Sequence, residues 1–455
     1  MKMAIQHLKD KSPSFLAALL VLTLAPLYFI SYQYRLVHPY GGSGTSKDDD
    51  AFSSTDFVRD WLSTHVVAPF NPSALATHCN LTEWHPNLVF NLENANGGIG
   101  NVRGNTLDFL FFAIEAGASI ILPGRATRSE EDISNVWAAR GTFDSFFDEE
   151  WFLHTMAQAF PQMAIYKLER HHKMLAPLPG NYLPRSRRSD TDPSNTKQAY
   201  LEHLDHWLKE NPNFQPENLT LVNLERTLWD IDTRSLPLGF RRNFGQILRI
   251  NPTIRRLAGI VVLNLAITFR HNINPASAIP RKAFYGAHLR TEADAKGAGW
   301  LNDGYSNFSA QTDAYIAQAL KHNLRTIYVA SGNSTDLELF RVKAASHRPP
   351  LNVTSKFDLL PPNEAAALRE LSWDQQALVD YEVLQRCSVF GGIVKSSFSY
   401  NIAITRDQRL EDEGRVIDPW GVMHREEGVA FDDGVSRVLG RDAWHEQRIP
   451  RGMWP

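Results

Sequence analysis

Short apolar runs alternate with amphipathic segments from about residue 88 onward. Residues 88–92 and 119–122 are apolar runs of strand length. Between them, residues 102–116 place apolar side chains such as Leu107 and Phe111 on one helical face. A strand, a helix and a second strand in this order form the unit from which parallel sheets are built. This part of the chain therefore predicts a doubly wound α/β domain.

The same alternation returns in the second half of the chain. We expect strands at 283–289, 326–330 and 389–390, and helices at 313–323, 335–344 and 372–387. Gly391-Gly392 is interpreted as a turn, and a further helix opens near Tyr400. The fold class that this predicts is α/β, with two Rossmann-like domains facing a cleft. Their expected boundaries are residues 81–275 and 276–455.

The amino-terminal segment has a different character. No charged residue stands between Lys11 and Arg35, and the stretch from Phe15 to Ile30 is almost wholly apolar. As a helix rising about 1.5 Å per residue, it is long enough to span a membrane with some tilt. We predict a cytoplasmic tail at 1–11, a signal-anchor transmembrane helix at 12–34 and a stem at 35–80. A cleaved signal peptide is the alternative, but its apolar region is normally shorter and no small-x-small site follows Ile30.

The distribution of charge and of sequons predicts that most of the chain lies in the lumen. Lys2, Lys9 and Lys11 precede the apolar stretch and a single arginine follows it, which by the positive-inside rule gives a type II protein. Five Asn-x-Ser/Thr sequons lie beyond the stretch and none before it, at Asn80, Asn218, Asn307, Asn333 and Asn352. The expected location is a membrane of the secretory pathway, Golgi or ER.

The composition narrows the possible partners and the possible roles of the cysteines. A net charge of −3 over 455 residues gives no reason to expect nucleic acid as a partner. Cys79 and Cys387 are the only cysteines and neither belongs to a CxxC motif, so thiolate zinc is unsupported and at most one disulfide is open to the chain.

The end of the run at 283–289 carries the first candidate chemistry. His288, Arg290, Glu292 and Asp294 follow one another where a buried strand is expected to end. Ligands of open α/β sheets bind beyond the carboxyl ends of strands, and a guanidinium offers a planar fork to a phosphate. The alternative is a surface ion-pair cluster.

Two turns supply further candidates. The glycine-rich turn at Gly98, Gly100 and Asn101 lets a backbone approach a ligand and opens a helix with free N–H groups. The run from Lys395 to Ser399 offers hydroxyls at another helix start. A bare turn and an ordinary N-cap are the alternatives.

Taken in order over about three hundred residues, these motifs resemble the GDP-fucose protein O-fucosyltransferase superfamily. The segments that carry the resemblance are Gly98-Ile99-Gly100-Asn101, His288-Leu289-Arg290, Asp380, Phe390-Gly391-Gly392 and Ser396-Ser397-Phe398-Ser399.

The resemblance implies a two-domain, GT-B-like glycosyltransferase that is generally metal-independent and inverts the sugar carbon, with GDP-fucose as donor substrate and no cofactor. By it, Arg290 holds the β-phosphate, His288 and Asp380 help to hold the nucleoside, Ser396 and Ser397 bind phosphate oxygens beside Phe398, and Asn101 faces the fucose and the acceptor. Glu292 is a candidate base by its position in the sequence, or else it orients Arg290.

The chain also departs from the pattern. Many relatives have a glutamine after the loop asparagine, where this chain has Val102 and Arg103. Ser388 stands where acidic residues are common, and Lys395 directly precedes the serine pair. These differences leave the acceptor open.

Other functions compete with this one. Asp230-Ile231-Asp232 could bind a divalent cation in a metal-dependent transferase, although no clean strand precedes it. The histidine pairs at 171–172 and 203–206 lack the spacing of a zinc protease. The function predicted is transfer of fucose from GDP-fucose to a Ser/Thr hydroxyl of a secretory-pathway protein. The alternatives are a GDP-sugar transferase acting on a glycan, or a catalytically silent glycan-binding or scaffold protein.

Overall fold

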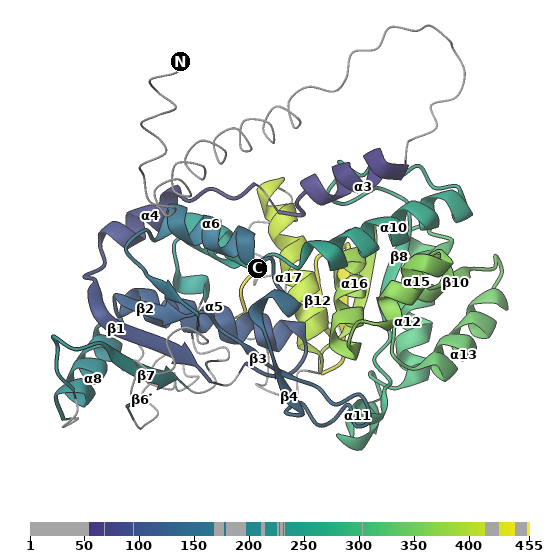
Figure 1. Ribbon diagram of the computed structural model, residues 1–455. Helices are drawn as coiled ribbons and strands as arrows, with labels where there is room; N and C mark the ends of the chain where they lie inside the picture. The colour runs from purple at the N-terminus through teal and green to yellow at the C-terminus, as the bar shows by residue number, and fades with distance from the viewer. Residues whose placement is uncertain are drawn as a thin grey trace, which may run out of the picture. The chain divides into compact units, whose positions relative to one another are not determined.

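The computed structural model (Figure 1) gathers residues 53–455 into one compact unit. The structure describes residues 54–455 except 68, 94, 168–176, 179–196, 211–213, 225–226, 228–230, 232, 303, 415–426 and 442–452. The predicted cytoplasmic tail, the transmembrane helix at 12–34 and the start of the stem lie outside the described residues.

A first parallel sheet is built from the amino-terminal half. Its strand order is β5-β2-β1-β7-β6, and every neighbouring pair is parallel. The strands are β1 (His85–Leu92), β2 (Ala118–Ile121), β5 (Ile165–Tyr166), β6 (Pro177–Leu178) and β7 (Thr220–Leu224). A separate antiparallel hairpin pairs β3 (Arg125–Thr127) with β4 (Ala139–Gly141).

A second sheet follows, in the order β10-β9-β8-β11-β13-β12. All its pairs are parallel except β12 with β13. The strands are β8 (Tyr285–His288), β9 (Thr326–Ala330), β10 (Asn352–Thr354), β11 (Val389–Ile393), β12 (Val429–Asp432) and β13 (Ser436–Leu439). An α/β fold with two largely parallel sheets is confirmed, whereas the expected cleft and domain boundaries stay predictions.

Helices cover these sheets (Figure 1). In the first half they are α3 (Ser54–Ser63), α4 (Ser73–Asn80), α5 (Ile99–Glu115), α6 (Glu149–Ala159), α8 (Lys197–Glu210), α9 (Leu238–Phe244) and α10 (Pro252–Phe269). In the second half they are α11 (Ala293–Gly297), α12 (Phe308–Lys321), α13 (Ser334–Ala345), α14 (Lys356–Leu359), α15 (Pro362–Arg369), α16 (Trp373–Gln385) and α17 (Ser397–Asp412). Short 3-10 turns lie at η1 (Phe143–Ser145), η2 (Thr233–Ser235), η3 (Gly245–Ile247) and η4 (Trp300–Asn302).

Residues 54–80, which were expected to belong to the stem, are part of the folded unit. This segment forms α3 and α4 and contributes buried side chains to the core, among them Phe57, Trp61 and Leu75. Two guanidinium groups satisfy main-chain carbonyls at the end of α3: Arg386 donates to Trp61 O at 3.0 Å and Arg255 to the next carbonyl along the chain at 2.6 Å. The polar composition that suggested a stem belongs only to the residues before Ser54.

The glycines at 391–392 form no turn. Both lie inside β11, which continues to Ile393. A Cβ on Gly391 would stand 2.0 Å from the Tyr285 hydroxyl, so glycine is needed here for packing against the neighbouring strand. As a result, the chain turns later, and α17 begins at Ser397 rather than near Tyr400.

The helix α10 is long and apolar enough to cross a membrane. However, half of its 18 residues are buried in the fold, and the helix packs against α16 and α3. Cys79 and Cys387 are both buried and both free, so they do not pair.

Candidate functional site

The sequence-predicted Arg290 lies two residues beyond the central strand β8. Its side chain is buried, and its guanidinium makes two ion pairs, Nη1 to Glu292 Oε2 at 2.5 Å and Nη2 to Asp294 Oδ2 at 2.6 Å. Gln311 of α12 holds the main chain at this point, because its Oε1 accepts from Arg290 N at 3.0 Å and its Nε2 donates to Arg290 O at 3.2 Å. The arginine is therefore fixed at both its backbone and its side chain.

Both oxygens of Glu292 are engaged. Oε2 binds Arg290, and Oε1 accepts from Gly332 N at 2.7 Å. Burial is the largest influence and raises the pKa of Glu292, but Arg290 and the Gly332 N–H together outweigh it and leave the pKa below its usual value. An ionised, saturated carboxylate is suited to orienting Arg290 and poorly suited to taking up a proton.

A second arginine joins this cluster from the first half of the chain. Arg128 directly follows β3, and its guanidinium contacts Asp294 at 3.3 Å and Asp374 at 3.2 Å while lying over the Trp373 ring. Asp294 thus bridges two guanidinium groups that come from opposite halves of the chain. Arg128, Arg290, Glu292, Asp294 and Asp374 together form what we call the bridging cluster, with two cations and three carboxylates.

His288 ends β8 and faces the start of α17. Its Nδ1 lies 2.7 Å from Ser399 Oγ, and its ring packs on Phe398 at a centroid distance of 4.5 Å. Burial lowers the pKa of His288 to about 4, so the ring is neutral at physiological pH. The His288 and serine-turn motifs, 111 residues apart in sequence, are therefore one local structure.

The glycine-rich turn meets the serine turn directly. Gly98 is the N-cap residue of α5, and Ser396 is the N-cap residue of α17. A Cβ on Gly100 would stand 2.6 Å from the carbonyl carbon and oxygen of Ser397. The positive ends of two helix dipoles thus lie together, which favours an anion nearby.

Asn101 contributes an unpaired acceptor. Its Oδ1 is buried and has no hydrogen-bond partner, while its main-chain oxygen accepts from Asn105 Nδ2 at 2.9 Å. A buried amide oxygen left without a donor costs free energy, and a ligand hydroxyl would supply the missing partner.

Asp380 lies deeper, on α16. One of its oxygens accepts from the Tyr328 hydroxyl at 2.6 Å, and the other binds Lys356. Burial raises the pKa of Asp380, which the nearby Lys356 ammonium opposes. With both oxygens committed to other side chains, the nucleoside role of Asp380 stays a prediction.

Several site residues were not found from the sequence. Arg128, Gln311 and Asp374 carry no local motif, and each becomes recognisable only when distant segments come together. The rival metal motif cannot be placed, because Asp230 and Asp232 lie outside the described residues. Among the residues that are described, no group of three or more His, Cys, Asp or Glu side chains is arranged to hold a metal ion.

Comparison with known proteins gives one family match and several structural neighbours of low sequence identity. The family model described as GDP-fucose protein O-fucosyltransferase matches residues 88–409, which include every candidate from Gly98 to Phe398. A crystal structure of POFUT1 in complex with GDP-fucose aligns with a TM-score of 0.43 at 12% identity, covering 78% of this chain and 98% of that one. The NodZ alpha-1,6-fucosyltransferase soaked with GDP-fucose aligns at 0.36 and 14%, covering 70% and 91%. NodZ from Bradyrhizobium aligns at 0.35 and 14%, covering 72% and 93%. A search of curated proteins finds no match.

Proposed function

Because the chain belongs to the GDP-fucose protein O-fucosyltransferase family, we propose that this glycosyltransferase moves fucose from GDP-fucose to a Ser/Thr hydroxyl of a secretory-pathway protein. The observation that carries the proposal is the family match over residues 88–409, within which Arg290 is held by two ion pairs and His288, two residues before it, contacts the start of α17.

The proposed reaction is an inverting displacement at the fucose anomeric carbon. The bond from that carbon to the β-phosphate oxygen breaks, and GDP leaves with the electron pair. The acceptor hydroxyl oxygen forms the new bond to the same carbon, and its proton passes to the departing β-phosphate or to water. Negative charge therefore develops on the β-phosphate, where a fixed cation and preorganised N–H donors stabilise it most.

Arg290 is suited to that task. A guanidinium has five N–H donors, and its two ion pairs leave others for phosphate oxygens. The Ser397 amide and the hydroxyls of Ser396 and Ser397 are proposed to share the phosphate, and Asn101 to accept from a sugar or acceptor hydroxyl. The bonding of Glu292 favours an orienting role over that of a general base.

One observation favours the catalytically silent alternative. In the bridging cluster, Arg290 is already paired with Glu292 and Asp294, so two carboxylates compete with an incoming diphosphate for its guanidinium. A protein that kept the fold for glycan binding alone would not need this guanidinium for a phosphate.

We also propose a type II topology in a Golgi or ER membrane. The uncharged segment at 12–34 and the five sequons support it. Asn80, Asn218 and Asn352 are exposed, as glycan acceptors must be.

Calorimetric titration of the detergent-solubilised full chain tests the proposal. We expect binding of GDP and GDP-fucose, weaker binding of GDP-mannose and UDP, and the same affinities with EDTA. Incubation with GDP-fucose and either Ser/Thr peptides or oligosaccharides then identifies the acceptor class. Binding without turnover would favour the silent alternative, and a preference for UDP or sensitivity to EDTA would contradict the donor assignment.

Arg290→Ala provides the decisive variant. It should abolish transfer by the folded protein, and it should also lower stability because Glu292 and Asp294 lose a buried cationic partner. The control is Arg256→Ala, which removes a partly exposed arginine paired with Glu364 and should leave transfer unchanged. Unchanged transfer by a well-folded Arg290→Ala protein would overturn the role given to Arg290.

A further inference from the structure

Residues 453–455 are packed into the core of the fold. Met453 and Trp454 are each 1% exposed. The Trp454 ring lies 4.6 Å from Phe244 and 5.9 Å from Phe111, centroid to centroid, and its indole N–H donates to Asp108 at 2.7 Å. Figure 1 shows this end of the chain beside α5 and α17. The segment therefore occupies a specific site between helices.

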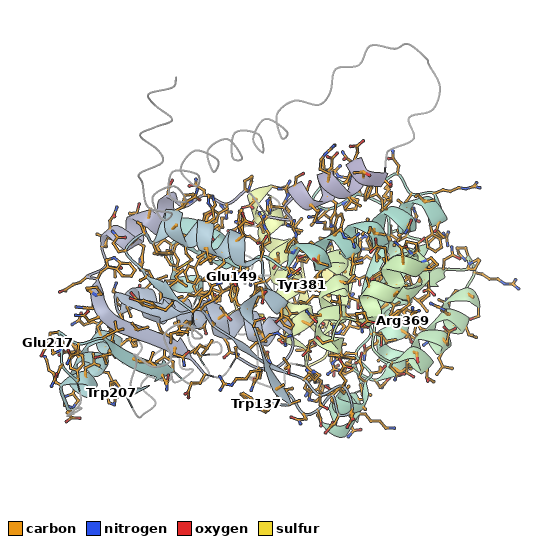
Figure 2. All side chains as sticks on the ribbon, in the orientation of Figure 1. Trp137, Glu149, Trp207, Glu217, Arg369 and Tyr381 are labelled. Carbon is orange, nitrogen blue, oxygen red and sulfur yellow. The ribbon has the colours of Figure 1, made fainter. Side chains whose placement is uncertain are left out.

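A single backbone atom of this segment joins the two helices. The carbonyl oxygen of Trp454 accepts from Arg103 Nη1 at 2.7 Å and from Asn401 Nδ2 at 3.2 Å. Arg103 is the fifth residue of α5, and Asn401 is the fifth residue of α17. Tyr381 of α16, labelled in Figure 2, hydrogen-bonds to Asn401 Oδ1 and so fixes which way the amide points.

The Arg103 guanidinium depends on this segment for its acceptors. Besides Trp454 O, it donates to Pro455 O at 2.7 Å and to Gly245 O at 2.8 Å. Two of these three carbonyls belong to residues 453–455. A buried guanidinium that loses its acceptors is strongly disfavoured, so the first turns of α5 would shift if the segment were absent.

The same two helices form the candidate donor site one turn earlier. α5 begins beside Gly98 and Gly100, α17 begins at Ser397, and the two meet in van der Waals contact there. We propose that residues 453–455 form an internal latch, which holds the first turns of α5 and α17 at the spacing that the diphosphate of the donor requires. The latch rests on the proposed function, and Arg103, Asn401 and Trp454 are its positioning residues.

The test compares full-length wild type with Arg103→Lys, Trp454→Ala and a variant lacking residues 453–455. Hydrogen exchange of backbone amides is measured at 98–105 and 397–403, and KM and kcat are measured for GDP-fucose. We expect exchange in both segments to accelerate, and KM to rise about tenfold with a smaller change in kcat, as expected for a loss of charged hydrogen bonds. An acetylated peptide of residues 448–455, added in excess to the deletion variant, should reverse both effects.

The matched control is Arg386→Lys. Arg386 is also a buried arginine that donates to main-chain carbonyls, but those carbonyls belong to Trp61 and Thr64, at the end of α3. This variant should leave exchange at 98–105 and KM unchanged. Arg103→Lys is mild enough to decide the question if the deletion variant does not fold.

Two results would overturn the latch. One is unchanged exchange in both segments for Arg103→Lys and the deletion variant. The other is acceleration that extends equally to β9, which would indicate general destabilisation. Wild-type protein that binds no GDP would instead contradict the proposed function, and the exchange comparison would still decide the latch.

Discussion

Gly100 and Ser397 touch where two helices begin. A Cβ on Gly100 would lie 2.6 Å from both the carbonyl carbon and the carbonyl oxygen of Ser397, and 2.8 Å from its Oγ. Backbone atoms cannot move aside as a flexible side chain can. The absence of a side chain at Gly100 is therefore what allows the glycine-rich turn and the serine turn, nearly 300 residues apart in the sequence, to form one site.

This contact predicts the effect of Gly100→Ala. The added methyl must push α5 away from α17, so we expect a loss of about 1–3 kcal/mol in the free energy of unfolding and a weaker affinity for GDP. The control for stability is Gly98→Ala, since a Cβ on Gly98 meets nothing within 4 Å. Thermal unfolding and GDP titration of both variants check the prediction, and equal stability of the two would contradict it.

Arg128 gives a second prediction. Its ion pair with Asp294 lies at 9% and 14% side-chain exposure, where solvent screens charges weakly. Arg128→Gln should weaken donor binding, because Asp294 then has only Arg290 as a cationic partner. A double-mutant cycle of Arg128→Gln with Asp294→Asn should give a coupling energy of about 1–3 kcal/mol in denaturant unfolding. Additive effects would indicate that the two side chains do not interact.

Much of the α/β architecture is predictable because it is local. The strand at 326–330 coincides with β9, and the helix at 335–344 differs from α13 by one residue at each end. Strands and helices of this kind can be recognised from the spacing of apolar side chains along the sequence. Gly391-Gly392 could not be interpreted correctly, because Gly391 is required by Tyr285 and Tyr315 and Gly392 by Ser399, and no pattern in the sequence records that proximity.

The site was only partly predictable for a related reason. His288, Arg290 and the serine turn follow strand ends, where polar side chains stand out against apolar runs. Arg128 is separated from Asp294 by 166 residues and from Asp374 by 246, so its role depends on tertiary structure alone. Arg103 was noted only as a departure from a family pattern, and its contact with Trp454 lies 351 residues away.

The buried pair of Lys356 and Asp380 gives a third prediction. Their side chains are 6% and 5% exposed, and Tyr328 donates a further hydrogen bond to the carboxylate. Lys356→Met leaves the buried Asp380 carboxylate without a cationic partner and should cost about 3–5 kcal/mol of stability. The double variant with Asp380→Asn should recover part of this loss. Chemical denaturation measures both. If the double variant is the less stable of the two, the pairing is not what stabilises this region.

His288 predicts a pH dependence. Its folded-state pKa of about 4 lies below the unfolded value of 6.5, so the unfolded chain binds the proton more readily. The stability contribution is therefore complete above about pH 6.5 and is lost as the pH falls toward 4. For this group the loss amounts to about 2 kcal/mol between pH 7 and pH 5.

The comparison of wild type with His288→Gln isolates this contribution. His65, whose pKa burial also lowers to about 4, remains in both proteins and cancels. The free energy of unfolding of His288→Gln should fall less steeply between pH 7 and pH 5 than that of wild type. Parallel pH profiles would mean that His288 titrates normally in the folded protein.

The sequons give the last prediction, because their side chains differ in what they already bind. Asn333 is the N-cap of α13: its Oδ1 accepts from Asp336 N, and its Nδ2 donates to Asp336 Oδ2 at 2.9 Å and to Thr291 O at 3.2 Å. A glycan on Nδ2 would remove one of these donations and place a sugar beside Thr291 or Asp336. Asn352 is exposed at the edge strand β10 and makes no such bonds through its side chain among the contacts described. In full-length protein purified from membranes of eukaryotic cells, mass spectrometry should therefore find glycan at Asn352 and an unmodified Asn333. Asn333→Ala should lose about 1 kcal/mol of stability as a lost helix cap, while Asn352→Ala loses glycan alone. Full glycan occupancy at Asn333 in active protein would contradict this assignment of its amide.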